Sequence, residues 1–409
     1  MGSPAASTHV LHAAIAPAHA LVDERRALYR LAADLFVPGA GLSDNLLDHP
    51  IVRYEIGRAL AGHGDVDLAL LHRVAAMRVR DAGVAVAADP LAADLLEAPL
   101  RIIAPPGASP RPLTEADGER FEAAAKIVAD GVRLFRRLAP EMADDLLAHV
   151  SMLAVLKAET AGGVVSASSR YVPGIVLIEE PSTAIEVAEA LVHEGAHEKF
   201  FDLAITREFL DAHAEEVEHF ETSWSHARWP LEQTLAAWHA YSCLAQFSRA
   251  CTSEVLGPIS LLPKARERAD EIGGWLVGHE TDLRADARWL LHALGGGCGG
   301  VRSDVDSPAP IAGIREDGRF RVRPDVRYRR AVTGRVVAAR VAHQPEIFWL
   351  DPDAGWLLGC LGHDRPALPF GAVLTRAVEE WAVDPGVAGS RLKTALGPLV
   401  ESLIVERAS

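Results

Sequence analysis

The chain has 409 residues, of which 49% are hydrophobic and 24% are charged. This composition excludes a disulfide mini-fold, wholesale disorder and a fibrous repeat, and it predicts a folded protein of two or three domains. Its net charge of −15 argues against non-specific nucleic-acid binding, because the phosphate backbone would be repelled. The four cysteines form no CxxC pair, which favours a reducing compartment. No apolar run approaches the ~18 residues of a membrane span and no signal peptide is evident, so we expect a cytoplasmic protein without a membrane partner.

Residues 20–160 carry apolar side chains three and four positions apart, as at Leu70, Leu71 and Val74, a spacing typical of amphipathic helices. A loop rich in proline at 105–112 joins two such blocks. Between 161 and 180, β-branched runs bounded by glycine and proline predict two short strands, which we expect to form a hairpin.

A long helix follows the second strand. Thr183 and Glu186 make a capping box, and the apolar pattern continues to about Phe201. A second amphipathic helix covers roughly 231–250. We therefore expect a mainly α protein with small β parts, in which 9–292 form a helical domain.

The next segment, 293–317, contains a run of glycines and reads as a linker. Beyond it, 318–409 predict a small α+β domain of the winged-helix kind. Its strand-like runs lie at 320–330, 336–341 and 346–350, and its helices at 353–361, 370–382 and 389–402.

The segment His193-Glu194-Gly195-Ala196-His197 is an HExxH motif within the capped helix. Residues four apart share one helical face, so both imidazoles can converge on one metal ion with Glu194 beside the open coordination positions. Two histidines on an ordinary helix surface are the alternative. The strand, the cap and the helix around the motif favour the metal site.

A third ligand should come from another element, because two ligands do not make a stable catalytic site. The metzincin extension requires glycine and histidine where this chain has Phe200 and Leu203, so that extension is absent. On the next helix, Glu232 and His239 lie seven residues apart on one face. We expect His239 to be the ligand, with Glu232 as the alternative; otherwise His239 is a core histidine.

The motif is compatible with two metals. Zinc would make a hydrolase in which Glu194 acts as a base on a metal-bound water. Iron(II) with three protein ligands would leave enough positions for a chelating co-substrate and dioxygen.

The segment from Val164 to about Gln246 resembles a family of HExxH proteins encoded with ribosomally made, post-translationally modified peptides. The resemblance rests on Ser168-Ser169, Pro173-Gly174, the run 189–197, Arg228-Trp229-Pro230-Leu231 and Trp238-His239-Ala240-Tyr241. Members of that family look like iron(II)- and 2-oxoglutarate-dependent peptide β-hydroxylases.

The resemblance implies that His193, His197 and His239 bind iron, and that 2-oxoglutarate and dioxygen are co-substrates. It places Arg228 in the matching block, and a guanidinium can hold a carboxylate through two parallel hydrogen bonds. Arg170 and Tyr241 are alternatives for this contact. Glu194 would then orient a ligand or water rather than serve as a proteolytic base.

The C-terminal part, about 318–409, resembles the leader-recognition domain of the pyrroloquinoline-quinone D type. The resemblance rests on 321–326, 349–354 and the final helix and tail at 396–405. It implies that a precursor's leader peptide binds as an added strand at a sheet edge. Between Arg319 and Arg340 there are eight arginines and one acid, Asp325, which would suit an acidic leader. The alternatives are a solvated basic face and a DNA-binding winged helix, and the net charge disfavours the latter.

Together these patterns predict an iron(II)- and 2-oxoglutarate-dependent oxygenase that hydroxylates a His-, Asp- or Asn-like side chain of a precursor peptide. A zinc peptidase that cleaves such a peptide is the alternative. A non-catalytic, metal-stabilised scaffold whose C-terminal module binds the partner is a third hypothesis.

Overall fold

The computed structural model describes residues 17–105, 107–210, 214–294, 314, 316–341, 345–363 and 365–408. It is 55% helical with 14% strand, arranged in small separate sheets, which confirms the expected mainly α class. The chain divides into two compact units. Most of the predicted linker at 293–317 lies outside the described residues. No helix in the described ranges is long and apolar enough to cross a membrane.

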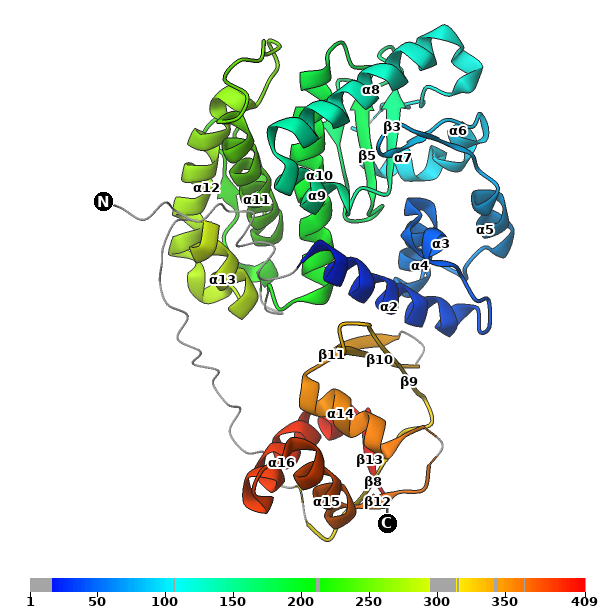
Figure 1. Cartoon of the computed structure of the whole chain (residues 1–409), viewed down its shortest axis with the longest axis vertical. Coiled ribbons are helices and arrows are strands. Elements are labelled where there is room, and N and C mark those ends of the chain that lie inside the picture. Colours follow the sequence, from blue (N-terminus) through cyan, green and yellow to red (C-terminus); the bar gives the residue numbers. More distant parts are fainter. Residues whose placement is uncertain are drawn as a thin grey trace. The chain divides into compact units, whose positions relative to one another are not determined.

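The first unit contains a five-stranded sheet (Figure 1). Its spatial order is β1 (Val79–Asp81), β2 (Ala85–Ala87), β3 (Met152–Leu156), β5 (Ile175–Glu179) and β4 (Ser166–Ala167). Strands β2, β3 and β5 run parallel, whereas β1 and β4 are antiparallel edge strands. The predicted hairpin at 161–180 is therefore confirmed as the pair of β4 and β5.

The all-helical expectation for 20–160 is wrong at β1, β2 and β3. Strand β3 is buried at every position, so its sequence shows no apolar–polar alternation. A short continuous apolar run of this kind cannot be told from a buried helix by periodicity.

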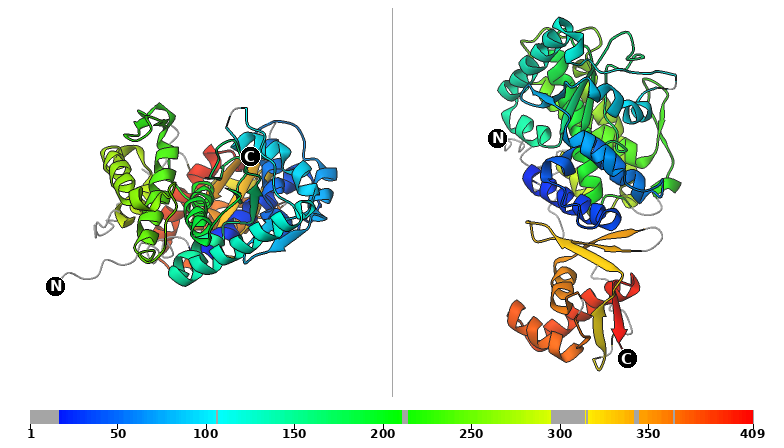
Figure 2. Two further views of the ribbon diagram at one scale, coloured as in Figure 1. Left: turned by 90° about the horizontal axis from the view of Figure 1, so that it is seen from above. Right: turned by 90° about the vertical axis from the view of Figure 1, so that its right-hand side faces the viewer.

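Helices surround this sheet and continue beyond it (Figures 1 and 2). Those that precede the helix with the HExxH motif are α3 (Asp44–Asp48), α4 (Pro50–Leu60), α5 (Leu68–Ala75), α6 (Leu91–Leu95), α7 (Glu97–Ile103), α8 (Glu119–Leu138) and α9 (Pro140–Leu147). The others are α10 (Ala184–Thr206), α11 (Leu231–Ser248), α12 (Ala265–Gly278) and α13 (Ala285–Leu294). A two-stranded hairpin of β6 (Phe220–Glu221) and β7 (Arg228–Trp229) precedes α11.

Helix α10 carries the HExxH motif and is central to the first unit. The predicted capping box is confirmed, since Thr183 Oγ1 accepts a bond from the Glu186 amide and Glu186 Oε2 accepts one from the Thr183 amide. The helix continues to Thr206, beyond the predicted end near Phe201. A Cβ on Gly131 of α8 would lie 2.5 Å from Val187 Cβ, so glycine is what allows α8 to pack closely on α10.

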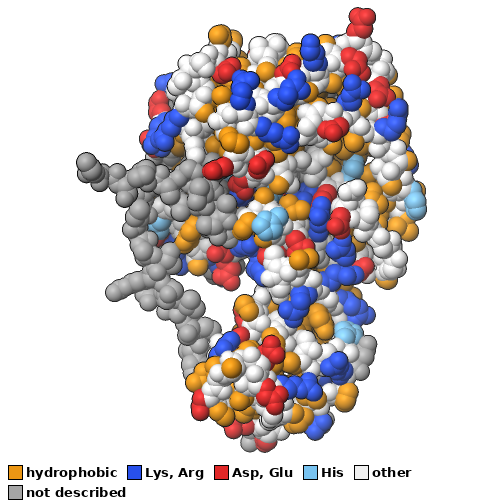
Figure 3. Space-filling model, in the orientation of Figure 1, with side chains coloured by type: hydrophobic (Ala, Val, Ile, Leu, Met, Phe, Trp, Pro, Cys, Tyr) orange, Lys and Arg blue, Asp and Glu red, His pale blue; other side chains and the backbone are white. Residues whose placement is uncertain are grey.

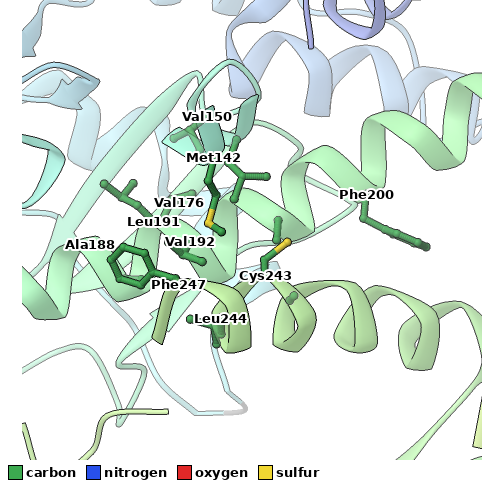
Figure 4. Packing of buried hydrophobic residues seen from close by; sticks show 14 of the residues in the cluster. Met142, Val150, Val176, Ala188, Leu191, Val192, Phe200, Cys243, Leu244 and Phe247 are labelled. Carbon is green, nitrogen blue, oxygen red and sulfur yellow. The ribbon is translucent and has the colours of Figure 1, made fainter. Parts of the chain in front are cut away.

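The core joins α10 to the sheet, to α9 and to α11 (Figure 4). Leu191 and Val192 of α10 pack in one cluster with Met142 of α9 and with Cys243 and Phe247 of α11. Because both sides of α10 are covered, its apolar residues form no single stripe. Burial of this kind fixes the helix in place and so fixes the direction of its polar side chains.

The second unit contains two three-stranded sheets, ordered β11-β10-β9 and β12-β8-β13. The strands are β8 (Arg319–Val322), β9 (Val326–Arg330), β10 (Val336–Arg340), β11 (Glu346–Leu350), β12 (Leu368–Pro369) and β13 (Val405–Ala408). Its helices are α14 (Pro352–Leu361), α15 (Phe370–Trp381) and α16 (Pro385–Glu401), close to the predicted ranges. The run predicted at 320–330 is broken into β8 and β9 at Pro324, which has no amide hydrogen for a sheet.

Residues 23–42 and 58–66 also belong to the second unit, a difference from the predicted domain limits of 9–292 and 318–409. The first of these segments contains most of α2 (Ala18–Phe36). Ala27 and Leu31 pack against Val337 and Ala339 of β10. The intervening residues of that strand point the other way, into the core formed with α14 to α16. Both faces of this sheet are thus covered, and this long-range packing has no local sequence signal.

Candidate metal centre

His193 and His197 lie one turn apart on α10, and their rings are in contact. Their centroids are 4.9 Å apart with an interplanar angle of 84°. Both side chains are partly exposed, although most positions around them on α10 are buried. Burial lowers the pKa of each ring to about 4. The charge of Arg268 lowers the pKa of His193 further, and His193 in turn lowers that of His197. Both imidazoles are therefore neutral at pH 7, the form that binds a metal.

The Nδ1 atom of His193 is buried and has no hydrogen-bond partner among the described residues. A buried polar atom without a partner costs free energy, which a bound ligand or ion can offset. The chemistry of the pair thus fits a divalent cation such as zinc or iron(II), for which imidazole is a common ligand.

His239 lies fully buried on α11, beside the turn that carries His197. Its Nδ1 is 3.0 Å from the carbonyl oxygen of Ala196, the residue before His197. A backbone carbonyl bonded to one ring nitrogen is the usual way in which a ligating histidine is oriented. Burial, followed by the charge of Lys199, lowers the pKa of His239 to about 3, so this ring is neutral as well.

No group of three or more His, Cys, Asp or Glu side chains is gathered closely enough to hold a metal ion in the described part of the chain. The structure therefore brings His193 and His197 together and sets His239 against the same turn, without closing a three-ligand group. Glu232, the alternative ligand, forms an ion pair with Arg170 at the start of α11. Of these two alternatives for the third ligand, only His239 packs against the turn that carries His197.

Glu194 is buried, and both of its carboxylate oxygens accept side-chain hydrogen bonds. Ser166 Oγ donates to Oε1 at 2.7 Å and Ser168 Oγ donates to Oε2 at 2.6 Å. Ser166 belongs to edge strand β4 and Ser168 follows it directly. The carboxylate is thus fixed between the motif helix and the edge of the sheet.

Arg228 and its two alternatives for the co-substrate contact are placed differently. Tyr241 is buried on α11, with its ring centroid 5.4 Å from that of His193. Arg228 is exposed on β7, opposite Glu221 of β6. Arg170 is exposed, ion-paired with Glu232, and donates to the Tyr171 hydroxyl at 3.0 Å. Tyr241 is therefore the member of this set that the structure brings to the histidine pair.

Arg268 of α12 is a residue at this site that the sequence analysis missed. Its Nη1 donates to the hydroxyl of Tyr241 at 2.9 Å. Its guanidinium carbon lies 4.9 Å from the ring centroid of Trp224 and 5.3 Å from that of Tyr241. No motif marks this arginine, because its place depends on how α12 packs against α11.

Charged side chains are buried along α10 on either side of the motif. Lys199 Nζ donates to both carboxylate oxygens of Asp145 of α9 at 2.6 Å. Further along α10, Asp202 Oδ2 lies 2.6 Å from His149 Nδ1. In a sequence, such charges are typical of a solvated helix face. Because they are buried and paired here, they fix α10 against α9 and against the residues that follow α9.

Comparison with known proteins assigns no family to the chain. No family model matches it, and no curated protein matches it either. The resemblances at 164–246 and 318–409 therefore stay predictions.

Proposed function

We propose that this protein is a non-haem iron(II)- and 2-oxoglutarate-dependent oxygenase that β-hydroxylates a His-, Asp- or Asn-like side chain of a ribosomally made precursor peptide. The observation that carries the proposal is the fixed carboxylate of Glu194 beside the neutral pair His193 and His197. Each oxygen of Glu194 accepts a hydrogen bond from a serine, so the carboxylate is held in one orientation beside the pair. This suits a residue that positions a metal ligand or a water molecule.

Bound iron(II) would supply the oxidising chemistry, with dioxygen and 2-oxoglutarate as co-substrates. His193 and His197 would hold the metal, and His239 would complete the set from α11. The bond between His239 and the Ala196 carbonyl keeps that ring against the turn of α10 that carries His197. Three protein ligands leave open positions for a chelating co-substrate, which a closed structural site would not.

The edge strand β4 offers a place for the peptide. Its one strand neighbour among the described residues is β5, so its other edge has no strand partner in that part of the chain. A peptide added there would pass Ser166 and Ser168, which bond Glu194 next to the histidine pair. Backbone pairing of this kind holds a peptide with little regard to its sequence, which suits an enzyme whose substrate is selected elsewhere.

We assign leader recognition to the second unit, and place the reaction in the cytoplasm. Basic charge is weak support for this assignment, because five of the eight arginines between 319 and 340 pair with acids of the same unit. Figure 3 shows basic and acidic side chains interspersed on the visible face of this unit. The better support is β11, an edge strand whose one neighbour among the described strands is β10. A leader would add to β11 through backbone hydrogen bonds.

Anaerobic titration with iron(II) and 2-oxoglutarate tests the proposal. We expect a weak visible charge-transfer band, which neither a zinc peptidase nor a metal-stabilised scaffold would give. The peptide encoded by a short open reading frame beside the gene should then gain about 16 mass units in the presence of dioxygen. Cleavage of that peptide with zinc bound would instead establish the metallopeptidase alternative.

A further inference from the structure

We infer that Arg268 is the anion-binding residue of this site and pairs with one carboxylate of a small dicarboxylate bound beside His193. The inference rests on the proposed function, which it deepens by naming the residue that selects the co-substrate class. It replaces Arg228 and Arg170 in that role.

Arg268 is held by aromatic side chains rather than by an acid. It is partly buried, with Trp224 and Tyr241 against its guanidinium and the Tyr241 hydroxyl accepting from Nη1. Among the described residues it has no carboxylate partner. A partly buried cation without a counter-ion is costly, and an anionic ligand would offset that cost.

The neighbouring arginines show the contrast. Arg266, two residues earlier on the same helix, forms an ion pair with Asp270 at 3.6 Å and is exposed. Arg170 is neutralised by Glu232. Arg228 is exposed on β7 and has no described contact with the histidine pair. Arg268 alone of these four combines partial burial with contact to the site.

Tyr241 connects Arg268 to the histidine pair. Its ring centroid lies 5.4 Å from that of His193 and 5.3 Å from the guanidinium carbon of Arg268. A ligand that spans this aromatic side chain needs an anionic group at one end and a metal-binding or hydrogen-bonding group at the other. A dicarboxylate with a few carbon atoms between its ends has this form, and the planar guanidinium can bind its carboxylate through two parallel hydrogen bonds.

The test is calorimetric titration of the iron(II)-loaded protein, under anaerobic conditions, with 2-oxoglutarate and with succinate. The variants are Arg268→Gln and Arg268→Lys, and Arg266→Gln is the matched control on the same helix. We expect Arg268→Gln to weaken binding of both ligands about ten- to hundredfold. Arg268→Lys should recover part of the affinity because it keeps the charge without the planar fork, and the control should bind as the wild type does.

Iron content and melting temperature are measured on every variant, so that a lost metal or a disturbed fold is not mistaken for a lost anion contact. Equal affinities in the wild type and Arg268→Gln would overturn the inference and leave the proposed function standing. Binding of succinate that depends on Arg268, without any binding of 2-oxoglutarate, would support the inference and contradict the proposed function. A wild type that binds neither ligand would overturn the inference as well.

Discussion

The hydroxyl of Ser168 donates a hydrogen bond to Oε2 of Glu194 at 2.6 Å, and so connects the edge of the sheet to helix α10. With the matching bond from Ser166 to Oε1, the carboxylate is held at both oxygens. Glu194 therefore joins the strand on which we place the peptide to the helix that carries the histidine pair. Its most direct effect is on the position of the turn of α10 that carries the histidine pair.

The first prediction concerns this carboxylate. In a hydroxylase, Glu194→Gln should lower product formation or iron affinity by about ten- to hundredfold, the usual effect of changing a residue that orients a metal ligand. The double variant Ser166→Ala with Ser168→Ala should have an effect in the same range, because it releases the same carboxylate. Product is measured by mass and iron by elemental analysis. Complete loss of activity in Glu194→Gln with full metal content and intact 2-oxoglutarate binding would instead indicate a proton-transfer role.

The second prediction concerns the metal ligands. His193→Ala and His197→Ala should each abolish retention of iron, because each removes one imidazole of the contacting pair. His239→Ala should do the same if His239 is the third ligand, whereas Glu232→Gln should retain the metal, since Glu232 is ion-paired with Arg170. Metal content after gel filtration measures the outcome. Full iron content in His239→Ala together with loss in Glu232→Gln would assign the third position to Glu232.

Much of the local structure could be predicted from the sequence. The capping box of Thr183 and Glu186, the hairpin before it and the helices of the second unit have local signals, namely cap residues, turn residues and periodicity. Strand β3 could not be predicted, because its burial on both faces removes alternation. The packing of Ala27 on β10 joins segments some three hundred residues apart and leaves no local pattern.

The site was predictable only where spacing within one helix sets the geometry. His193 and His197 meet because four residues make about one turn. Arg268 and the serine bonds to Glu194 depend on contacts between elements, which the sequence does not show. Arg170 and Glu232 were predicted to have separate roles, and no local pattern indicates that their side chains form an ion pair with each other.

The third prediction concerns the buried ion pair of Lys199 and Asp145. Both side chains are nearly inaccessible, so replacing Lys199 takes the positive charge away from a carboxylate that stays buried. Lys199→Met should lower the free energy of unfolding by about 3–5 kcal/mol, measured by urea denaturation. Adding Asp145→Leu should recover most of the loss. A single variant as stable as the wild type would show that this pair does not hold α10 against α9.

The last prediction concerns pH and His49, which lies away from the metal motif in sequence. Burial, and then the charge of Arg53, lower the pKa of His49 from 6.5 to about 4. Below pH 6.5 the unfolded chain therefore binds more protons at this residue than the folded chain does. The free energy of unfolding must then fall as the pH drops from 6.5 to about 4. At about 1.4 kcal/mol per pKa unit, His49 accounts for about 3 kcal/mol of this loss.

The variant His49→Asn isolates this contribution. Asparagine does not titrate, and its side-chain oxygen can accept a hydrogen bond from the Ile51 amide, as His49 Nδ1 does at 3.3 Å. Urea denaturation of both proteins at pH 7 and pH 4.5 gives the comparison, in which the other buried histidines contribute equally and cancel. We expect the variant to lose less stability on acidification than the wild type by about 2 to 3 kcal/mol. Equal losses would mean that the folded and unfolded chains protonate His49 alike, and that its ring is not buried from solvent.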